Sequence, residues 1–116
     1  MLQPESLFNI LSDPTRLRAL MLMQSASEVC VCELTFALNE SQPKISRHLA
    51  LMREAGIVES RREGTWMHYR LSRELPGWSS KILKHMHTHI SGQRPYKDDV
   101  KILRQMTSRP QGSACA

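Results

Sequence analysis

Residues 31–56 read VCELTFALNESQPKISRHLALMREAG, and this stretch decides the fold. It holds two sets of apolar residues at helical spacing, Val31, Leu34, Ala37 and Leu38, then Ile45, Leu49 and Met52. Ser41 is a helix-capping residue type and Gly56 follows the second set, so only two or three residues around Asn39-Glu40 separate the two helices. Two helices with so tight a joint have the spacing of a helix-turn-helix, whose second helix enters the major groove of DNA.

Two further helices are expected before this unit. A short amphipathic stretch over residues 7–11 stops at Ser12-Asp13. Pro14 suits the first position of a second helix, with Asp13 as its cap. Arg16 and Arg18 leave the apolar face of that helix, so we expect both on its solvent side.

After Gly56 the apolar period changes from helical to alternating, which is typical of strands. The expected elements are strands over 57–62 and 66–71, a turn at 63–65, and helices over 76–90 and 95–107, the last of them weaker. The final residues, SRPQGSACA, look disordered. The predicted fold class is mainly α with a small β-hairpin, a winged helix-turn-helix.

The composition fits one domain with an anionic partner. The 116 residues carry 16 Lys and Arg against 11 Asp and Glu, a formal charge of +5, which favours a polyanion if the charge gathers on one face. Two each of Phe, Trp and Tyr are few for a protein that stacks single-stranded bases. No apolar run approaches the ~20 residues of a membrane span, and the first residues lack a secretory signal. We therefore expect a cytoplasmic protein with reduced thiols, no membrane partner and no disulfide between Cys30 and Cys32.

The inward placement of Ile45, Leu49 and Met52 leaves an outward set on the second helix: Gln42, Pro43, Lys44, Ser46 and Arg47. Such side chains can contact phosphates or base edges. The hairpin carries Arg61 and Arg62 and would act as a wing on the DNA backbone, while His48 borders the packed face and would be semi-buried or touch a phosphate. A solvated helix face would explain Lys44 and Arg47 alone, but the order helix, tight turn, helix and basic hairpin favours double-stranded DNA.

Cys30 and Cys32 lie two positions apart in EVCVCEL, residues 28–34, at the expected start of the helix that precedes the tight turn. Side chains two apart on a helix point to nearly opposite sides, so an intact helix would keep the two thiols apart. Backbone N–H groups at a helix N-terminus lower the pKa of a thiol and favour the thiolate. From the residues alone, the pair is equally a ligand set for a soft ion or two small buried hydrophobes.

Four segments make the sequence resemble a known family: LSDPTRLRAL (11–20), VCVCELTFAL (29–38), SQPKISRHLALMREAGIV (41–58) and GTWMHYRLS (64–72). Together they resemble the ArsR family of winged-helix repressors, and CVCEL resembles its arsenical-responsive branch. The resemblance implies a homodimeric repressor that leaves operator DNA when trivalent arsenic or antimony, as arsenite or antimonite, binds cysteine thiolates. It also implies dimer contacts through the first and fifth helices, here around Leu7 and Leu11 and around Trp78, Ile82 and Met86.

In domain terms, residues 1–91 would form the winged-helix DNA-binding and dimerisation domain, and residues 92–116 a C-terminal helix and tail. Trivalent arsenic and antimony are soft and prefer thiolates. For Cys30 and Cys32 to share one ion, the first turn of their helix would have to unwind, which would make ligation incompatible with the DNA-binding shape.

The branch's best-known pattern has a third cysteine three positions after the second, where this chain has Thr35. A threonine hydroxyl is a far poorer partner for arsenic than a thiolate. We therefore expect Cys30 and Cys32 to act alone, with solvent or a small thiol in the third position, and Cys115 as the competing ligand. A two-thiol site would suit a singly methylated arsenical, and arsenite, antimonite and organic arsenicals all stay open as inducers.

Two other regulators remain as alternatives, a sensor of a divalent metal such as zinc and a thiol redox sensor. Zinc accepts mixed ligands, and HMHTH places His85 and His89 on one helix face with His87 opposite and Asp98 and Asp99 nearby. The zinc-binding relatives' ligand spacing is not reproduced here. An enzyme is not expected, since the sequence has no Gly-rich phosphate loop, no recognisable Ser/His/Asp layout and no need for a catalytic cofactor.

Overall fold

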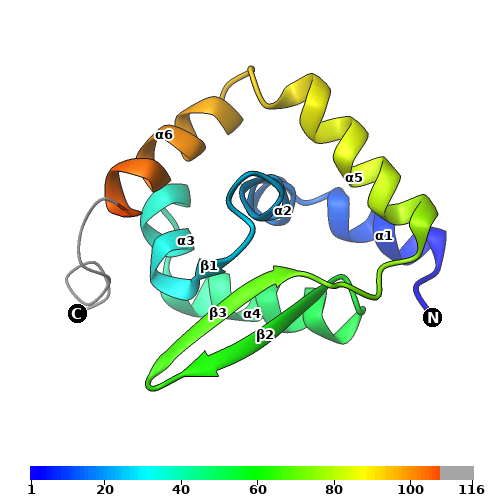
Figure 1. Ribbon diagram of the computed structural model, residues 1–116, viewed down its shortest axis with the longest axis horizontal. Coiled ribbons are helices and arrows are strands. Elements are labelled where there is room, and N and C mark those ends of the chain that lie inside the picture. The colour runs from blue at the N-terminus through cyan, green and yellow to red at the C-terminus, as the bar shows by residue number, and fades with distance from the viewer. Residues whose placement is uncertain (108–116) are drawn as a thin grey trace.

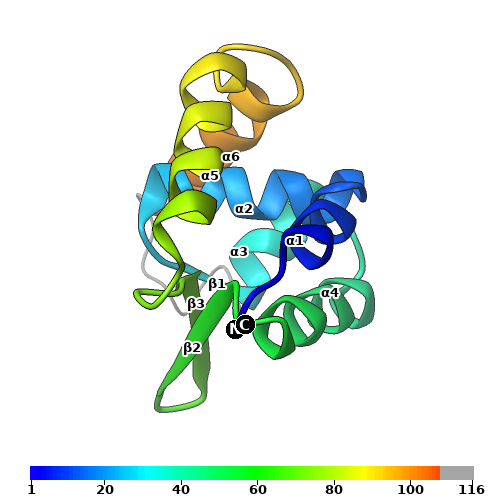
Figure 2. The same cartoon turned by 90° about the vertical axis from the view of Figure 1, so that its right-hand side faces the viewer.

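Helix α2 (Pro14–Ala26) runs through the middle of the molecule in the computed structural model, which describes residues 1–107 (Figures 1 and 2). The other elements are α1 (Pro4–Leu11), β1 (Val29–Cys30), α3 (Val31–Leu38), α4 (Gln42–Glu54), β2 (Val58–Glu63), β3 (Trp66–Leu71), α5 (Gly77–Ile90) and α6 (Tyr96–Thr107). Helix α2 contacts every other helix of this set, and five consecutive residues, 19–23, are buried. It is therefore enclosed on nearly all sides, whereas its residue pattern predicts a single inward face.

The predicted starts of α2 and α4 and the end of α4 are confirmed, and local residues explain them, whereas α1 begins at Pro4, three residues before the predicted stretch. The carboxylate of Asp13 accepts hydrogen bonds from the N–H groups of Thr15 (2.8 Å) and Arg16 (3.1 Å) at the start of α2. The hydroxyl of Ser41 accepts one from the N–H of Lys44 (3.4 Å) at the start of α4. Gly56, just past the end of α4, has φ +82°, a left-handed conformation that favours glycine.

The wing has three strands rather than the predicted two. The strands β2 and β3 form the expected hairpin, with Val58 opposite Leu71 and Glu63 opposite Trp66. The two-residue strand β1 adds to the other side of β3 in the order β1-β3-β2, with Val29 opposite Tyr69 and Cys30 opposite His68. Two residues are too few to show an alternating apolar pattern in the sequence. The strand forms because it pairs with β3.

Helix α6 is joined to the core rather than set apart as a separate C-terminal segment. Leu103 and Met106 are each 3% exposed, and α6 packs on α2 and α3. The guanidinium of Arg18, expected in solvent, donates two hydrogen bonds to the carboxylate of Asp99, at 2.8 and 2.7 Å. The predicted tail lies outside residues 1–107.

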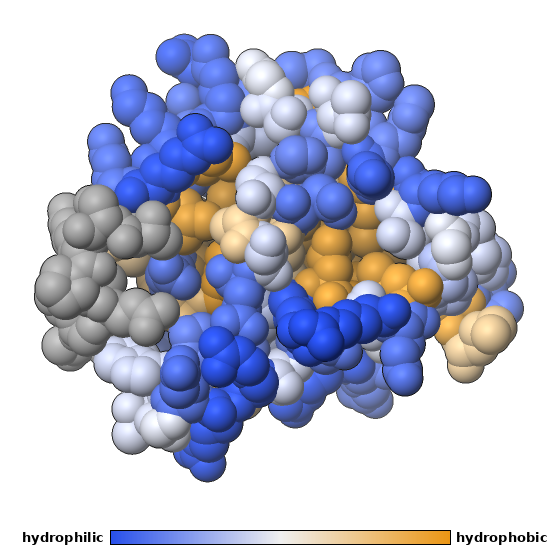
Figure 3. Space-filling model, viewed as in Figure 1, coloured by the Kyte–Doolittle hydropathy of each residue, from blue (hydrophilic) through white to orange (hydrophobic). Residues whose placement is uncertain are grey.

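Helices α5 and α1 differ in how much apolar surface they leave uncovered. Helix α5 buries Leu83, while Trp78 is 37% exposed and Ile82 and Met86 are only partly buried. Leu7 is 0% exposed within this protomer, so the predicted dimer contact of α1 would have to come from its neighbours. Figure 3 shows hydrophobic surface in the middle of one face, beneath the arch that α5 and α6 form in Figure 1. Within residues 1–107, no helix is long and apolar enough to cross a membrane.

The pairing of Arg18 with Asp99 predicts a large effect of one substitution on stability. Arg18→Ala leaves the carboxylate of Asp99, whose side chain is 3% exposed, buried without its partner. We expect the free energy of unfolding in urea to fall by about 3 kcal/mol, the low end for a buried pair, because Arg18 itself is partly exposed. Asp98→Ala is the matched control, because the pair of Asp98 with Arg94 is mostly in solvent and should contribute at most ~0.5 kcal/mol. Equal losses in the two variants at one protein concentration would contradict the anchoring role of Arg18.

Candidate nucleic-acid interface and thiol site

The helix-turn-helix is built as the sequence predicts. Three residues, 39–41, join α3 to α4, and Asn39 turns the chain with φ +54°. Ile45, Leu49 and Met52 are at most 1% exposed and fix the inward side of α4. The opposite side carries the predicted DNA contacts, and four of them are exposed: Gln42, Pro43, Ser46 and Arg47.

The basic side chains of this face fall into two groups. The Nζ of Lys44 lies 2.6 Å from a carboxylate oxygen of Glu40, one turn earlier in the chain. Arg47 and Arg62 are exposed and make no ion pair within residues 1–107. Since a neutralised cation attracts a phosphate less than a free one, Arg47 and Arg62 are the stronger candidates for DNA contacts.

Arg61 is tied to the base of the wing. Its guanidinium donates to both carboxylate oxygens of Glu28, at 2.7 and 2.8 Å, and lies 3.6 Å from Glu63. The hydrogen bond from Arg61 holds the pKa of Glu28 below its usual range. Arg61 therefore links β2 to Glu28, the residue that precedes β1. If Arg61 contacted a DNA phosphate, its charge would be shared between that phosphate and two carboxylates.

His48 is half-buried, which is one of the two placements that the sequence allowed for it. Its Nδ1 lies 3.4 Å from a guanidinium nitrogen of Arg16, and its Nε2 lies 3.9 Å from the carboxylate of Asp13. Burial lowers the pKa of His48. The guanidinium of Arg16 also donates to the carbonyls of Asn9 and Ile10 at the end of α1, so this cluster joins α1 and α2 to α4 rather than facing a phosphate.

The two thiol positions lie together, against the expectation that they point apart. Cys30 ends β1 and caps α3 with extended backbone (φ −95°, ψ 164°), while Cys32 is in the first turn of α3. The two sulfur atoms are 3.2 Å apart, which is contact and not the ~2.05 Å of a bond between them. The argument from opposite helix faces fails because Cys30 is not in helical conformation. Cys32 is disulfide-bonded in this structure, so its sulfur would have to be reduced before the two sulfurs could share an ion.

Glu33 holds Cys30 in a capping box. The N–H of Cys30 donates to Oε1 of Glu33 (2.8 Å), and the N–H of Glu33 donates to the sulfur of Cys30. Burial raises the pKa of the Cys30 thiol to about 11, and the nearby Glu33 carboxylate adds to the shift. The expectation of a lowered pKa at the helix N-terminus is therefore wrong for Cys30, because desolvation outweighs the backbone N–H groups.

A cleft of about 270 Å³ opens beside the two sulfurs. It lies between the start of α3, the start of α4 and the tip of the wing, and its lining residues are Cys30, Val31, Cys32, Thr35, Gln42, Thr65, Trp66 and Met67. Thr35 stands at its wall with its hydroxyl donating to the carbonyl of Val31 (2.9 Å). Cys115 lies outside the described residues.

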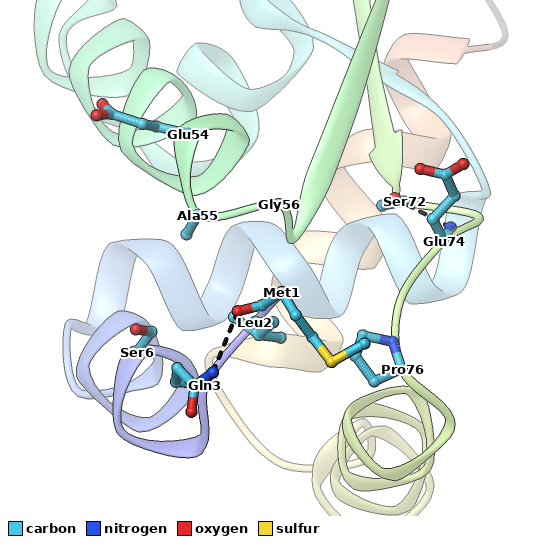
Figure 4. Close-up of a pocket in the computed structure, with 10 residues that line it drawn as sticks. All are labelled: Met1, Leu2, Gln3, Ser6, Glu54, Ala55, Gly56, Ser72, Glu74 and Pro76. Atoms are coloured by element: carbon cyan, nitrogen blue, oxygen red, sulfur yellow. Dashed lines mark hydrogen bonds between the residues drawn. The ribbon is translucent and has the colours of Figure 1, made fainter.

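Figure 4 shows a larger cavity, of about 540 Å³, at the far end of the wing from this cleft. It lies between the start of α1, the end of α4 and the loop before α5. The side-chain charges at its wall are those of Glu54 and Glu74, and it has no cysteine. This cavity therefore suits neither a phosphate nor a soft ion.

No sequence pattern pointed to His68, which lies behind the cysteines. It is opposite Cys30 in the sheet and 4% exposed. Its Nδ1 lies 3.7 Å from Glu28 and its Nε2 3.5 Å from Glu63. Its two partners, Glu28 and Glu63, are 35 positions apart, so no local sequence pattern could have predicted that they meet at His68.

The histidines of α5 do not gather into a metal site. The rings of His85 and His89 are 4.5 Å apart, whereas the Nε2 of His87 lies 2.6 Å from the hydroxyl of Ser25. The carboxylate of Asp99 is already paired with the guanidinium of Arg18. Within residues 1–107 there is no group of three or more His, Cys, Asp or Glu side chains that could hold a metal ion.

A helix-turn-helix with an exposed basic reading helix and a β-hairpin after it is a winged helix-turn-helix, a class of DNA-binding regulators. Residues 13–60 match the family described as bacterial regulatory protein, arsR family. An arsenical resistance operon repressor of Escherichia coli (strain K12) is 54% identical over 82 residues, 71% of this chain and 70% of the relative. The arsenic resistance transcriptional regulator ArsR2 of Pseudomonas putida is 46% identical over 95% of this chain and 94% of its own length.

The chain belongs to the ArsR family, as the resemblance predicted, and it is a transcription regulator rather than an enzyme. Solved structures agree. HlyU from Vibrio cholerae matches 74% of this chain and 89% of its own with a TM-score of 0.66 at 28% identity. The AntR antimony-specific transcriptional repressor matches 74% of this chain and 75% of its own with a TM-score of 0.61 at 26% identity.

The placement of Arg47 predicts how salt affects DNA binding. Arg47→Ala removes an exposed cation from the outward side of α4, so affinity for an operator duplex should fall and the slope of log affinity against log salt should flatten by about one unit. Lys101→Ala, an exposed position on α6, is the control and should leave the slope unchanged. An Arg47→Ala protein with the parent's affinity and slope would remove Arg47 from the interface.

The raised pKa of Cys30 predicts its reactivity toward iodoacetamide. Because the thiolate is the reacting form, alkylation of Cys30 in the reduced, folded protein should rise about tenfold per pH unit from pH 8 to 10. In the urea-unfolded chain the rate should level off above pH ~9. Burial alone would slow the reaction equally at every pH, so the pH dependence, followed by peptide mass spectrometry, reports the pKa. If the alkylation rate of the folded protein levels off at the same pH as that of the unfolded chain, the pKa of Cys30 is not raised.

Proposed function

We propose that this chain is a metalloid-responsive transcriptional repressor, which binds operator DNA as a homodimer in the cytoplasm and releases it when trivalent arsenic or antimony binds Cys30 and Cys32. The observation that carries the proposal is the 3.2 Å contact between the two sulfurs, beside a cleft that touches both the reading helix and the wing. Relatives named as arsenical resistance repressors, and the structure of an antimony-specific repressor, support the inducer class.

The sulfur geometry suits a shared soft ion. Two sulfurs each bound at ~2.3 Å to one ion lie ~3–4 Å apart, depending on the bond angle. The 3.2 Å separation is already in that range, so little rearrangement is needed once the disulfide of Cys32 is reduced. Soft thiolates select such ions over hard ones.

Ligation would act on the joint between the wing and the helix-turn-helix. Cys30 pairs with His68 in β3, and Cys32 belongs to α3, which packs against the reading helix α4. An ion on both sulfurs, with its third ligand, would enter the cleft between Gln42 and Trp66. If that occupancy is incompatible with the spacing of α4 and the wing on DNA, the ion binds the free protein better, and by linkage it weakens DNA binding.

A peroxide-type redox sensor is the second candidate, because Cys32 is disulfide-bonded in this structure and its sulfur contacts that of Cys30. The pKa of about 11 disfavours it, since peroxide reacts with the thiolate and the Cys30 thiol stays protonated near neutrality. An ion with exchangeable hydroxyls needs no free thiolate at rest, because each departing hydroxyl takes up the thiol proton. Release by arsenite under reducing conditions supports the metalloid sensor, and release by peroxide alone supports the redox sensor.

The dimer rests on the uncovered apolar surface of α5. Trp78, Ile82 and Met86 recur at intervals of four residues and so share one side of the helix, which the rest of the protomer covers only in part. Leu11 of α1 is also partly buried. A second copy on this surface would set two reading helices side by side, as half-sites one helical turn apart require.

Three cysteine variants test the thiol site in an operator-release assay. Cys30→Ser and Cys32→Ser each leave one thiol of the pair, so both proteins should bind the operator and ignore arsenite up to at least tenfold the parent's half-release concentration. Cys115→Ser is the matched control and should respond as the parent does. Loss of response in Cys115→Ser would make the C-terminal thiol a ligand, and normal release from either of the first two would exclude the pair as the sensor.

A charge on α5 tests the dimer. Ile82→Glu places a carboxylate in the proposed interface, so the protein should sediment as a monomer at micromolar concentration and bind the operator much more weakly. Lys97→Glu, an exposed position on α6, is the control and should remain dimeric. Circular dichroism checks that Ile82→Glu is folded. A parent protein that sediments as a monomer would refute the proposal.

A further inference from the structure

Three helices meet at one side chain, that of Arg16 in the first turn of α2. Its guanidinium donates to the carbonyls of Asn9 (3.1 Å) and Ile10 (3.0 Å) in the last turn of α1, and its Nη1 lies 3.4 Å from Nδ1 of His48 in α4. The last carbonyls of a helix lack partners within that helix, so a donor from outside is well matched to them. Arg16 therefore links α1 and α2 to the helix that carries the proposed DNA contacts.

The contact with Arg16 requires one protonation state of His48. An arginine N–H group can only donate, so Nδ1 of His48 accepts in this contact, and the single proton of the neutral ring lies on Nε2. Within residues 1–107, Nε2 is a buried atom without a hydrogen-bond partner, and it lies 3.9 Å from a carboxylate oxygen of Asp13. The neutral ring is therefore held by Arg16 on one side and by no hydrogen bond on the side of Asp13.

A second proton on the ring would change the partner of His48. With both nitrogens protonated, Nδ1–H would face the N–H groups and the positive charge of Arg16, so that contact would be lost. Nε2–H would at the same time be attracted by the carboxylate of Asp13, which caps α2. The two protonation states of His48 therefore favour different placements of the ring between α2 and α4.

The surroundings of His48 favour the neutral ring. They comprise Asp13 and Arg16 at the start of α2, Lys44 and Arg47 on α4 itself, and the backbone carbonyls of α1. Burial lowers the pKa of His48, and the three positive charges act in the same direction, whereas Asp13 opposes them. The pKa is higher in any arrangement that moves the ring away from these causes, so acid favours the arrangement in which His48 has left Arg16.

We propose that Arg16 is a positioning residue for DNA binding, which acts through neutral His48 to hold α4 in its reading orientation, so that protonation of His48 weakens operator binding. The proposal rests on the DNA-binding part of the proposed function and goes beyond it, because it assigns neither residue a contact with DNA or with the inducer. His48 directly follows Arg47, the exposed cation expected at a phosphate, so a shift of the ring also displaces that cation. A histidine that touched a phosphate would have the opposite effect, since its positive charge would strengthen binding in acid.

The test measures operator affinity from about pH 8 to pH 5.5, on the duplex of the Arg47→Ala titration, and divides the value for the parent by that for His48→Asn. The division cancels the other titrating groups of the protein and of the duplex. Asparagine keeps an acceptor near the position of Nδ1 and takes up no proton, so His48→Asn should bind as the parent does at pH 8. In acid the parent should lose roughly three- to tenfold relative to His48→Asn, since one pKa unit between two arrangements corresponds to tenfold. His85→Asn, an exposed position on α5, is the matched control and should follow the parent at every pH.

Arg16→Lys tests the other half of the cluster, and His48→Asn remains an independent test if this variant does not fold. Lysine keeps the charge, but its single ammonium cannot reach both the carbonyls of α1 and the ring of His48, so binding at pH 8 should weaken several-fold and lose most of its acid dependence. A ratio of the parent to His48→Asn that stays level or rises in acid, or an Arg16→Lys protein with the parent's affinity and pH profile, would overturn the proposal. Failure of the parent to bind the duplex at pH 8 would instead overturn the proposed function.

Discussion

Two backbone pairs, Val29 with Tyr69 and Cys30 with His68, join the cysteine segment to the wing, and the arrangement of the site depends on them. They hold Cys30 in an extended conformation at the point where α3 begins, which allows its sulfur to reach that of Cys32. The same pairs place β3, and with it Trp66 and Met67, across the cleft from the thiols. The ion pair of Glu28 with Arg61 closes the other side of this joint. A change at the sulfurs can therefore act directly on the wing through β1 and on the reading helix through α3 (Figure 1).

Charge on the DNA-facing side is partly compensated within the protein. Lys44 and Arg61 are held by Glu40 and Glu28, while Arg47 and Arg62 are exposed without an ion pair in the described part of the chain. The paired cations tie α4 and the wing to their neighbours, and we propose that the exposed ones contact phosphates. A regulator that must be released benefits from this division, since a small number of strong contacts can be lost when the separation of helix and wing changes.

Local chemistry in the sequence was enough to predict the helices, the tight turn and the hairpin. The Asp13-Pro14 start, the Ser41 cap and the glycine at 56 are signals read within a few residues, and each one is confirmed. What the sequence missed depends on partners distant along the chain. The strand β1 needs β3 about 40 positions later, and Arg18 needs Asp99, 81 positions away. The error about the cysteines follows from the missed strand, because a helical Cys30 would indeed have pointed away from Cys32.

The account's central claim is that ligation of the thiols and DNA binding are coupled through this joint. Coupling between two equilibria is reciprocal, so the factor by which the inducer weakens DNA binding must equal the factor by which DNA weakens inducer binding. The direct measurement is the affinity of the reduced protein for arsenite, followed by calorimetry, with and without saturating operator duplex. The account predicts that the duplex weakens arsenite binding by the same factor that arsenite weakens duplex binding in a separate titration. Equal arsenite affinity with and without DNA would contradict it, because thiol ligation would then have no bearing on the DNA-binding state.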